Sequence, residues 1–218
     1  FIDLAETHGL IDAITDAVLV QALFDAAQWQ QLGLSLKVAI NVSMNNLKAV
    51  EFTERVSAHA AAAGVAPQSI VLEVTESQLM QDLRAPLEIL TRLRLRRFHL
   101  SIDDFCTGHS SLTQLRDVPF DELKIDQSFV HGAHSNETVR AIFAASLGLG
   151  QVLGMEVVAE GVEDQADWAF VKQSECDVAQ GYYIARPMPT DALPAWIAAW
   201  PRQRDAIEFS PSSLFGAL

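Results

Sequence analysis

The sequence predicts an α/β fold, a TIM-like (β/α)8 barrel whose first two strands are expected to precede Phe1. Six short apolar runs alternate with helix-like segments, as in a sheet of parallel strands. Each run also ends in a polar side chain, and these residues are Asn41, Glu73, Asp103 with Asp104, Lys124, Glu160 and Gln180. An open sheet gathers its ligands at one switch point, whereas polar residues at every strand end favour a closed barrel with one shared mouth.

The predicted strands are compact apolar runs of the length expected for buried strands. In chain order they cover residues 36–42, 69–75, 98–104, 122–126, 156–160 and 178–182. Helix-length segments separate them, so the connections are expected to be right-handed crossovers between parallel strands.

The predicted helices cover residues 11–29, 45–64, 80–95, 110–116, 136–153 and 163–174, and a last helix covers 191–200 with Pro201 as its end. Eight strands close such a barrel, and only six are visible. Because the helix at Ile11 must follow a strand, two strands are expected upstream. The predicted domain is a single barrel over 1–200, followed by a loosely ordered tail over 201–218.

Composition excludes several classes of function. The 218 residues include 28 acidic and 15 basic side chains, a formal charge of −13 that argues against nucleic-acid binding. The two cysteines, Cys106 and Cys176, have no metal-ligand spacing and fit a reducing compartment, so a cytoplasmic location is expected. No apolar run is long enough for a membrane span, so no membrane contact is expected from this segment.

The acidic strand ends point to a hard cation. Asn41, Glu73, Asp103, Asp104 and Glu160 offer only oxygen ligands, which favour magnesium or manganese over zinc or copper. Adjacent aspartates repel each other unless a cation or proton lies between them, and both can reach one mouth only where their strand ends. A cap of a helix or turn by Asp104 is the competing interpretation.

Three more residues have two interpretations each. Lys124 and Asp126 share a strand face, so Lys124 either pairs with Asp126 or donates to a phosphate or to an attacking water. Glu160 is interpreted as a general base or metal ligand rather than a surface glutamate because it ends a strand. Gln180 either hydrogen-bonds a substrate or makes a structural amide contact.

Several ordered motifs resemble one family. The stretches AINVS, LEVTES, SIDDFCTGHSSL, DELKIDQSFV, VVAEGVE and QGYYIARPMP resemble the EAL-domain phosphodiesterases of cyclic di-GMP, from FIDLAE at Phe1 to about Trp200. The resemblance implies a TIM-like barrel that hydrolyses one phosphodiester bond of cyclic di-GMP to linear pGpG with Mg²⁺ or Mn²⁺. It also implies bacterial second-messenger signalling, a homodimer, and a sensory or receiver domain upstream.

The resemblance assigns roles to the strand ends. It implies that metal is held by Asn41, Glu73, Asp103 and Asp104, and that Glu160 holds metal or acts as the base. Lys124 would orient the attacking water. Substrate binding is assigned to Gln180 and Asp126, and Glu76 and Ser77 would steady the loop after DDF.

Two departures from the family pattern affect these expectations. The family's Glu-Ala-Leu strand, whose glutamate is a metal ligand, lies before FIDLAE and outside this sequence. Family members usually read DDFGTGYSS, whereas this chain has Cys106 and His109 in that loop. Cysteine replaces a glycine suited to unusual backbone angles, so the loop geometry is in question. Redox sensing by Cys106 competes with a tolerated substitution.

Two other functions stay open at this point. A catalytically degenerate domain would bind cyclic di-GMP as a receptor without cleaving it. An unrelated barrel enzyme, such as a metal-dependent lyase or an aldolase, would use Lys124 as a Schiff base.

Overall fold

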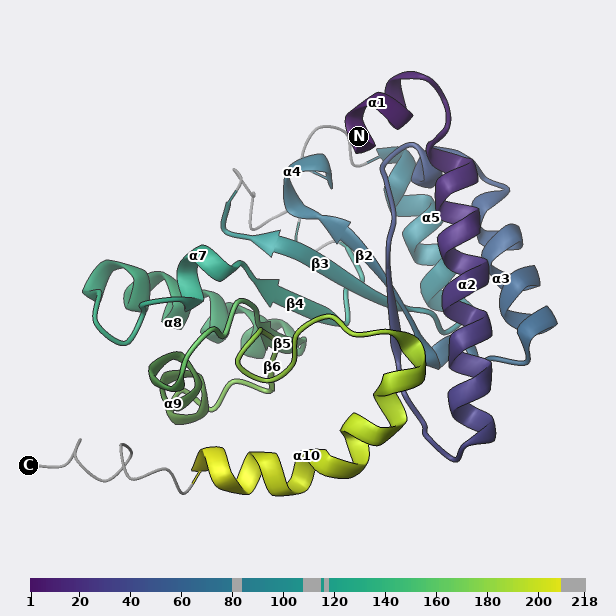
Figure 1. The fold of residues 1–218 in the computed structure, drawn as a ribbon. Coiled ribbons are helices and arrows are strands. Elements are labelled where there is room, and N and C mark those ends of the chain that lie inside the picture. Colours follow the sequence, from purple (N-terminus) through teal and green to yellow (C-terminus); the bar gives the residue numbers. More distant parts are fainter. Residues whose placement is uncertain (80–83, 108–114, 116–117, 209–218) are drawn as a thin grey trace, which may run out of the picture.

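A computed structural model describes residues 1–79, 84–107, 115 and 118–208. Six parallel strands form one sheet in the order β1-β2-β3-β4-β5-β6. The strands are β1 Val38–Asn41, β2 Ile70–Thr75, β3 His99–Phe105, β4 Glu122–Ile125, β5 Glu156–Ala159 and β6 Val178–Ala179. The sheet curls into an incomplete barrel with helices around it (Figure 1). The predicted fold class is confirmed.

Helices precede, connect and follow the strands. They are α1 Ile2–Thr7, α2 Ile11–Gln31, α3 Phe52–Ala63, α4 Glu76–Leu79, α5 Arg84–Leu95, α7 Gln127–Val130, α8 Glu137–Leu153, α9 Gln165–Gln173 and α10 Leu193–Glu208. Short 3-10 helices cover Asn46–Lys48, Pro67–Ser69 and Thr190–Ala192. The helices α2, α3 and α5 lie on the side of β1 and β2, and α8 and α9 lie on the side of β5 and β6 (Figure 1).

Burial along the strands follows their place in the sheet. The central strand β2 is buried along nearly its whole length, as expected when both faces of a parallel sheet are covered. In β1, Val38 and Ile40 are buried while Ala39 and Asn41 are exposed. One face of β1 therefore packs on the helices, and its other face, which looks into the curl of the sheet, is open.

The sequence placed all six strands within a few residues but extended the last one too far. The strand β6 ends at Ala179, whereas residues 178–182 were expected to be extended. Gln180 and Gly181 lie outside the strand, and the carbonyl of Gln180 accepts a hydrogen bond from Val162 N at 3.0 Å. The loop after β6 is thus fixed to the loop after β5.

The single helix expected over 45–64 is wrong, because a 3-10 helix and α3 divide that stretch. The side chain of Asn46 explains the break. Its amide oxygen accepts from Ser43 N at 3.0 Å and from the Thr15 hydroxyl at 3.1 Å, and its amide nitrogen donates to Asp12 at 2.6 Å. Such side-chain bonds compete with helix hydrogen bonds.

Pro201 does not end the last helix, contrary to the prediction, because α10 continues to Glu208. The fixed φ of proline is compatible with a helix, and its missing N–H removes one hydrogen bond. The helix predicted over 80–95 is described only from Arg84 onward, and of the helix predicted over 110–116 only residue 115 lies within the described residues. Among the described residues, no helix is both long and apolar enough to cross a bilayer.

Candidate metal and substrate site

The carboxyl ends of the strands bring the predicted polar residues to one face of the sheet. Paired residues on neighbouring parallel strands point to the same face, and so do residues two apart on one strand. By these two rules Asn41, Glu73, Asp103, Lys124 and Glu160 share the inner face. The register pairs that connect them are Asn41 with Glu73, Glu73 with Ser101, Ser101 with Glu122 and Lys124 with Val158.

Lys124 lies at the centre of this group. Its Nζ is 2.9 Å from Glu73 Oε1, 3.1 Å from Asp103 Oδ1 and 2.7 Å from Glu160 Oε1. These carboxylates come from β2, β3 and the residue after β5, so one ammonium group connects four consecutive strands. Lys124 is only 5% exposed, and its charge is compensated by direct contacts rather than by water.

The protonation preferences follow from burial and charge. Burial alone would lower the pKa of Lys124, but Glu73 and Glu160 overcome this effect and raise it well above its ordinary value. Burial raises the pKa of Glu73 and of Glu160, although Lys124 opposes both shifts. Burial, followed by the charges of Asp103 and Asp126, raises the pKa of Asp104. Because several carboxylates surround one lysine, the site carries more negative charge than Lys124 neutralises.

A local irregularity in β3 lets two adjacent aspartates serve one site. The register with β4 shifts between Ile102 and Phe105, and Asp104 has a φ of +54°. This left-handed conformation turns the chain where regular alternation would separate the two side chains. Ligand oxygens of Asp103, Asp104 and Glu160 lie within 4.8 Å of one another.

These three residues fit a hard divalent cation. All their donor atoms are carboxylate oxygens, the type that Mg²⁺ and Mn²⁺ prefer. A cation would also offset the negative charge of these buried or half-buried carboxylates. The competing interpretation of Asp104 is a cap of a helix or turn by its side chain. Among the contacts of the described residues, nothing supports this cap, because Thr107 donates its hydrogen bonds to the main-chain carbonyl of Asp104 and not to its side chain.

A cavity of about 320 Å³ lies next to these carboxylates. Its walls include the predicted residues Asp104, Asp126, Glu160 and Gln180. Asp126 does not pair with Lys124, which was one predicted alternative. It caps α7 instead, because its Oδ1 accepts hydrogen bonds from the main chain and hydroxyl of Ser128.

Sequence reasoning missed part of the cavity wall, which is formed by Gln127, Gly161, Glu163, Gly181 and Tyr182. Gln127 begins α7 and the others lie in loops, where strand periodicity gives no signal. The two glycines were a usable signal. Gly161 has a φ of +68°, and a Cβ there would lie 2.2 Å from Gln127 Cβ. A Cβ on Gly181 would lie 2.2 Å from the Val162 carbonyl oxygen.

Asn41 is the predicted ligand that stands apart. It is exposed on the edge strand β1, and its register partner is Glu73. It therefore shares the face of the site without joining the cluster around Lys124. No conclusion about its role follows from the register alone, and its assignment as a ligand stays a prediction.

The loop after β3 is attached to the site by Glu76. This buried carboxylate accepts a hydrogen bond from Cys106 N at 2.7 Å, a contact of the type expected of a loop-steadying residue, whereas Ser77 is exposed. Cys106 has a φ of +76°, and its thiol and the Ser146 hydroxyl are hydrogen-bonded at 3.1 Å. Burial raises the pKa of Cys106, which makes a reactive thiolate less accessible. His109 lies outside the described residues.

Comparisons with known proteins agree with this geometry. The family model for the EAL domain matches residues 1–187. The cyclic di-GMP phosphodiesterase NbdA of Pseudomonas aeruginosa is 39% identical over 201 residues, which is 92% of this chain and 26% of that protein. The chain spans from about a quarter to about half of the length of its curated relatives.

Solved structures are also similar. The MucR phosphodiesterase of Pseudomonas aeruginosa, in complex with c-di-GMP, has a TM-score of 0.84 and 36% identity, covering 88% of this chain and 78% of that one. BlrP1 of Klebsiella pneumoniae, in a complex with manganese and c-di-GMP, has a TM-score of 0.76 and 29% identity, covering 82% of this chain and 45% of that one.

Proposed function

The chain belongs to the EAL domain family, and from this premise we propose that it hydrolyses one phosphodiester bond of cyclic di-GMP, giving linear pGpG, with Mg²⁺ or Mn²⁺ as cofactor. The observation that carries the proposal is the cluster in which Lys124 contacts Glu73, Asp103 and Glu160 beside an oxygen-lined cation site. Relatives named as cyclic di-GMP phosphodiesterases support the choice of substrate.

The cation would be held by Asp103, Asp104 and Glu160, with Glu73 and Asn41 as further ligands from the neighbouring strands. A divalent cation bound there would supply electrostatic stabilisation of the negative charge that develops on the phosphoryl oxygens.

Lys124 and Glu160 would carry the proton chemistry. The raised pKa keeps Lys124 protonated, so its ammonium group can donate to the attacking water and orient it. Glu160 then accepts a proton from that water as the general base. The 2.7 Å contact between Lys124 Nζ and Glu160 Oε1 keeps the two groups together.

Gln180 and Asp126 would bind the nucleotide from the cavity wall. The amide of Gln180 can both donate and accept hydrogen bonds, as recognition of a guanine edge requires. Asp126 offers acceptor oxygens, one of which already fixes the start of α7. Both residues line the cavity that adjoins Glu160.

The same contacts argue against a Schiff-base enzyme. A lysine nucleophile needs a lowered pKa so that its amine is neutral, whereas Glu73 and Glu160 raise the pKa of Lys124. A receptor without activity has weaker support, because Lys124 and the carboxylates proposed for hydrolysis lie together at the described strand ends.

The decisive experiment follows pGpG by chromatography after the full-length protein is incubated with cyclic di-GMP and Mg²⁺ or Mn²⁺. We expect pGpG to form. Its formation should be abolished by EDTA and in the double variant D103N/D104N. Binding of cyclic di-GMP by a folded wild-type protein without any product would overturn hydrolysis in favour of the receptor function. A homodimer and an upstream sensory or receiver domain remain proposals, which sedimentation and the full-length sequence would test.

A further inference from the structure

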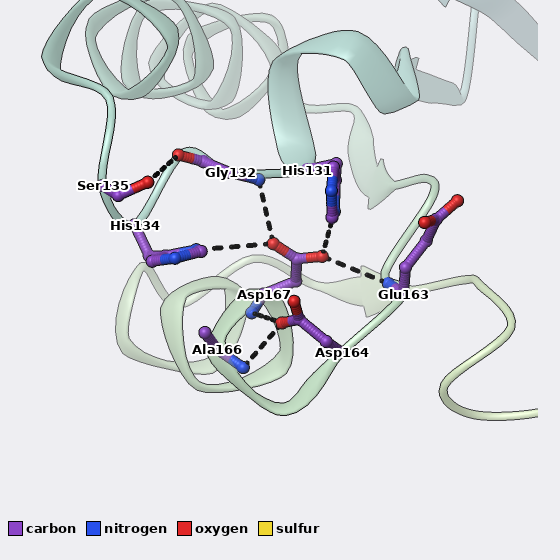
Figure 2. Close-up of polar contacts among 8 residues, drawn as sticks. All are labelled: His131, Gly132, His134, Ser135, Glu163, Asp164, Ala166 and Asp167. Atoms are coloured by element: carbon purple, nitrogen blue, oxygen red, sulfur yellow. Dashed lines mark hydrogen bonds and ion pairs between the residues drawn. The ribbon is translucent and has the colours of Figure 1, made fainter.

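A second polar cluster, separate from the cation site, surrounds Asp167 (Figure 2). This aspartate lies in the first turn of α9 and is 0% exposed. An ionised carboxylate can only accept hydrogen bonds, and a buried one needs several donors to compensate for lost hydration. Asp167 has four nearby donors, which come from Gly132, Glu163, His131 and His134.

The donors come from two different connections. Gly132 N donates to Oδ1 at 3.0 Å and His131 Nδ1 to Oδ2 at 2.7 Å, both from the connection between α7 and α8. Glu163 N donates to Oδ2 at 3.2 Å from the connection between β5 and α9. The His134 ring is farther, with Nδ1 at 3.6 Å from Oδ1. One buried carboxylate therefore holds together two segments that are distant in sequence.

Both connected segments lead to the cavity wall. Glu163 and Gly161 line the cavity three and one residues after Glu160, and Gln127 lines it from the start of α7. Gly161 packs directly against Gln127, since a Cβ at position 161 would overlap that side chain. A displacement of Glu163 would therefore move the cavity wall beside Glu160.

The bonding pattern favours an anchor over a second metal centre. Atoms of His131, Asp164 and Asp167 lie within 4.8 Å of one another, as in some metal sites. However, both Asp167 oxygens already receive main-chain N–H groups, and the Asp164 side chain accepts from Ala166 N and Asp167 N at the start of α9. A cation would have to displace the bonds that shape the loops.

We propose that Asp167, held by His131, is a positioning residue that fixes Glu163 and the wall of the nucleotide cavity. This inference rests on the proposed function for its link to cyclic di-GMP. Asp167 itself lies outside the cavity, so it acts on the substrate through the loop after β5 and not by direct contact.

The test compares D167N with D177N in the full-length protein. Asp177 is the control because its carboxylate also accepts a main-chain hydrogen bond, from Val157 N at 2.8 Å, but it is exposed and binds near the start of β5, away from the cavity wall. In D167N an amide N–H₂ group replaces one carboxylate oxygen. It faces N–H donors and cannot accept their hydrogen bonds. We expect the KM for cyclic di-GMP to rise about tenfold while kcat changes less than about threefold, as for lost binding geometry. D177N should keep the wild-type KM.

Hydrogen–deuterium exchange supplies a readout that needs no catalysis. Exchange in the peptide covering 160–164 should accelerate in D167N and, to a smaller extent, in H131Q, and stay at the wild-type rate in D177N. Unchanged protection in both D167N and H131Q would overturn the anchor, as would equal KM values for D167N and wild type. If wild type forms no pGpG, the proposed function fails, whereas the exchange comparison still decides whether Asp167 holds the loop.

Discussion

At the level of single residues, Lys124 explains how so many carboxylates coexist at the end of a buried strand. Its ammonium group is close enough to hydrogen-bond three of them and is almost fully shielded from water. Removing one partner from such a buried group leaves the other charges uncompensated, which is costlier than losing an exposed ion pair. Lys124 therefore has a structural role beside its proposed catalytic one.

We predict that K124A lowers turnover of cyclic di-GMP by roughly 100-fold or more, because a positioned proton donor is lost. In the presence of EDTA it should also lower the free energy of unfolding, by about 3 kcal/mol. Burial of Lys124 adds this cost in stability to the loss of activity. Denaturant unfolding and product assays would measure both effects.

K37A is the matched control for this prediction. Lys37 forms a single ion pair with Glu156 at 3.2 Å, and both side chains are exposed. Its replacement should change stability by less than about 1 kcal/mol and leave turnover intact. An equal stability loss in K37A and K124A would contradict the special role of the buried cluster.

Cys106 offers a second prediction at this scale. Its φ of +76° is unfavourable for a side chain with a Cβ and suits glycine. We expect C106G to be more stable than C106A by about 1 kcal/mol, since both variants lose the thiol contact to Ser146 and only glycine relieves the strain. Thermal or denaturant unfolding would measure this difference in stability. A stability of C106G equal to or lower than that of C106A would contradict the prediction.

At the level of elements, the strands were predictable because their signal is local. Apolar runs that end in a polar residue marked β2, β3, β4 and β5 nearly to the residue. The bulge that turns Asp104 into the site is different, because it depends on how β3 pairs with β4 and has no periodic signature. The break at Asn46 is also tertiary in origin, since its partners Asp12 and Thr15 lie in α2.

Helix ends were predictable to the extent that caps are local. The helix expected at 136 begins where Asn136 accepts bonds from Thr138 N and Val139 N, a common N-cap arrangement. The helix expected at 163 begins after Asp164, which caps α9 in the same way. The predicted end at Pro201 is wrong because a proline removes only one main-chain hydrogen bond. A helix whose other main-chain hydrogen bonds are made can contain it.

The link between the α7–α8 connection and α9 should depend on pH. The hydrogen bond that Asp167 accepts from His131, and then the charge of Asp167, raises the pKa of His131, and Glu163 and Asp164 act in the same direction. His134 is the other titratable group beside Asp167. A raised pKa in the folded state means that the contribution of His131 to stability is complete below its unfolded value of about 6.5 and is lost at higher pH.

We therefore predict that the difference in Tm between wild type and H131Q is largest near pH 5.5 and shrinks toward pH 9. The His131 ring is 53% exposed, so solvent will reduce the size of the effect. H8Q is the control, because the His8 ring contacts the carbonyl oxygen of Leu4 and not a carboxylate. A difference that is constant from pH 5.5 to 9 would contradict ionisation of His131 as the cause.

At the level of the whole molecule, the net charge of −13 is partly concentrated at the mouth of the sheet. Raised pKa values of Glu73, Asp104 and Glu160 indicate that the folded protein holds these charges at some cost. A bound divalent cation would relieve that cost and favour the folded state by mass action.

We predict that Mg²⁺ or Mn²⁺ at about 100 times its Kd raises the Tm by roughly 5–10 °C in a domain of this size. D104N removes one of several like charges, so without the cation its Tm should equal or exceed that of wild type. It also removes one ligand, so the cation should raise the Tm of this variant only a little. D177N should retain the full increase. Differential scanning calorimetry with and without EDTA would separate these outcomes.

The whole site could be predicted only in part, for a spatial reason. Strand ends converge because the sheet is parallel, and this follows from the sequence pattern. The cavity wall made by Gly161, Glu163 and Tyr182, and the buried anchor at Asp167, depend on how loops after different strands pack together. Those contacts join residues whose positions in the sequence share no period.

The strand order also bears on how the protein is made. Each strand pairs with the strands next to it in the chain, so the sheet can grow one strand at a time as the polypeptide leaves the ribosome. Lys124 then meets Glu73 and Asp103 before Glu160 has been synthesised. A nascent chain interrupted before β5 would hold a partly neutralised lysine but neither the proposed base nor the cavity wall, and could not consume the nucleotide.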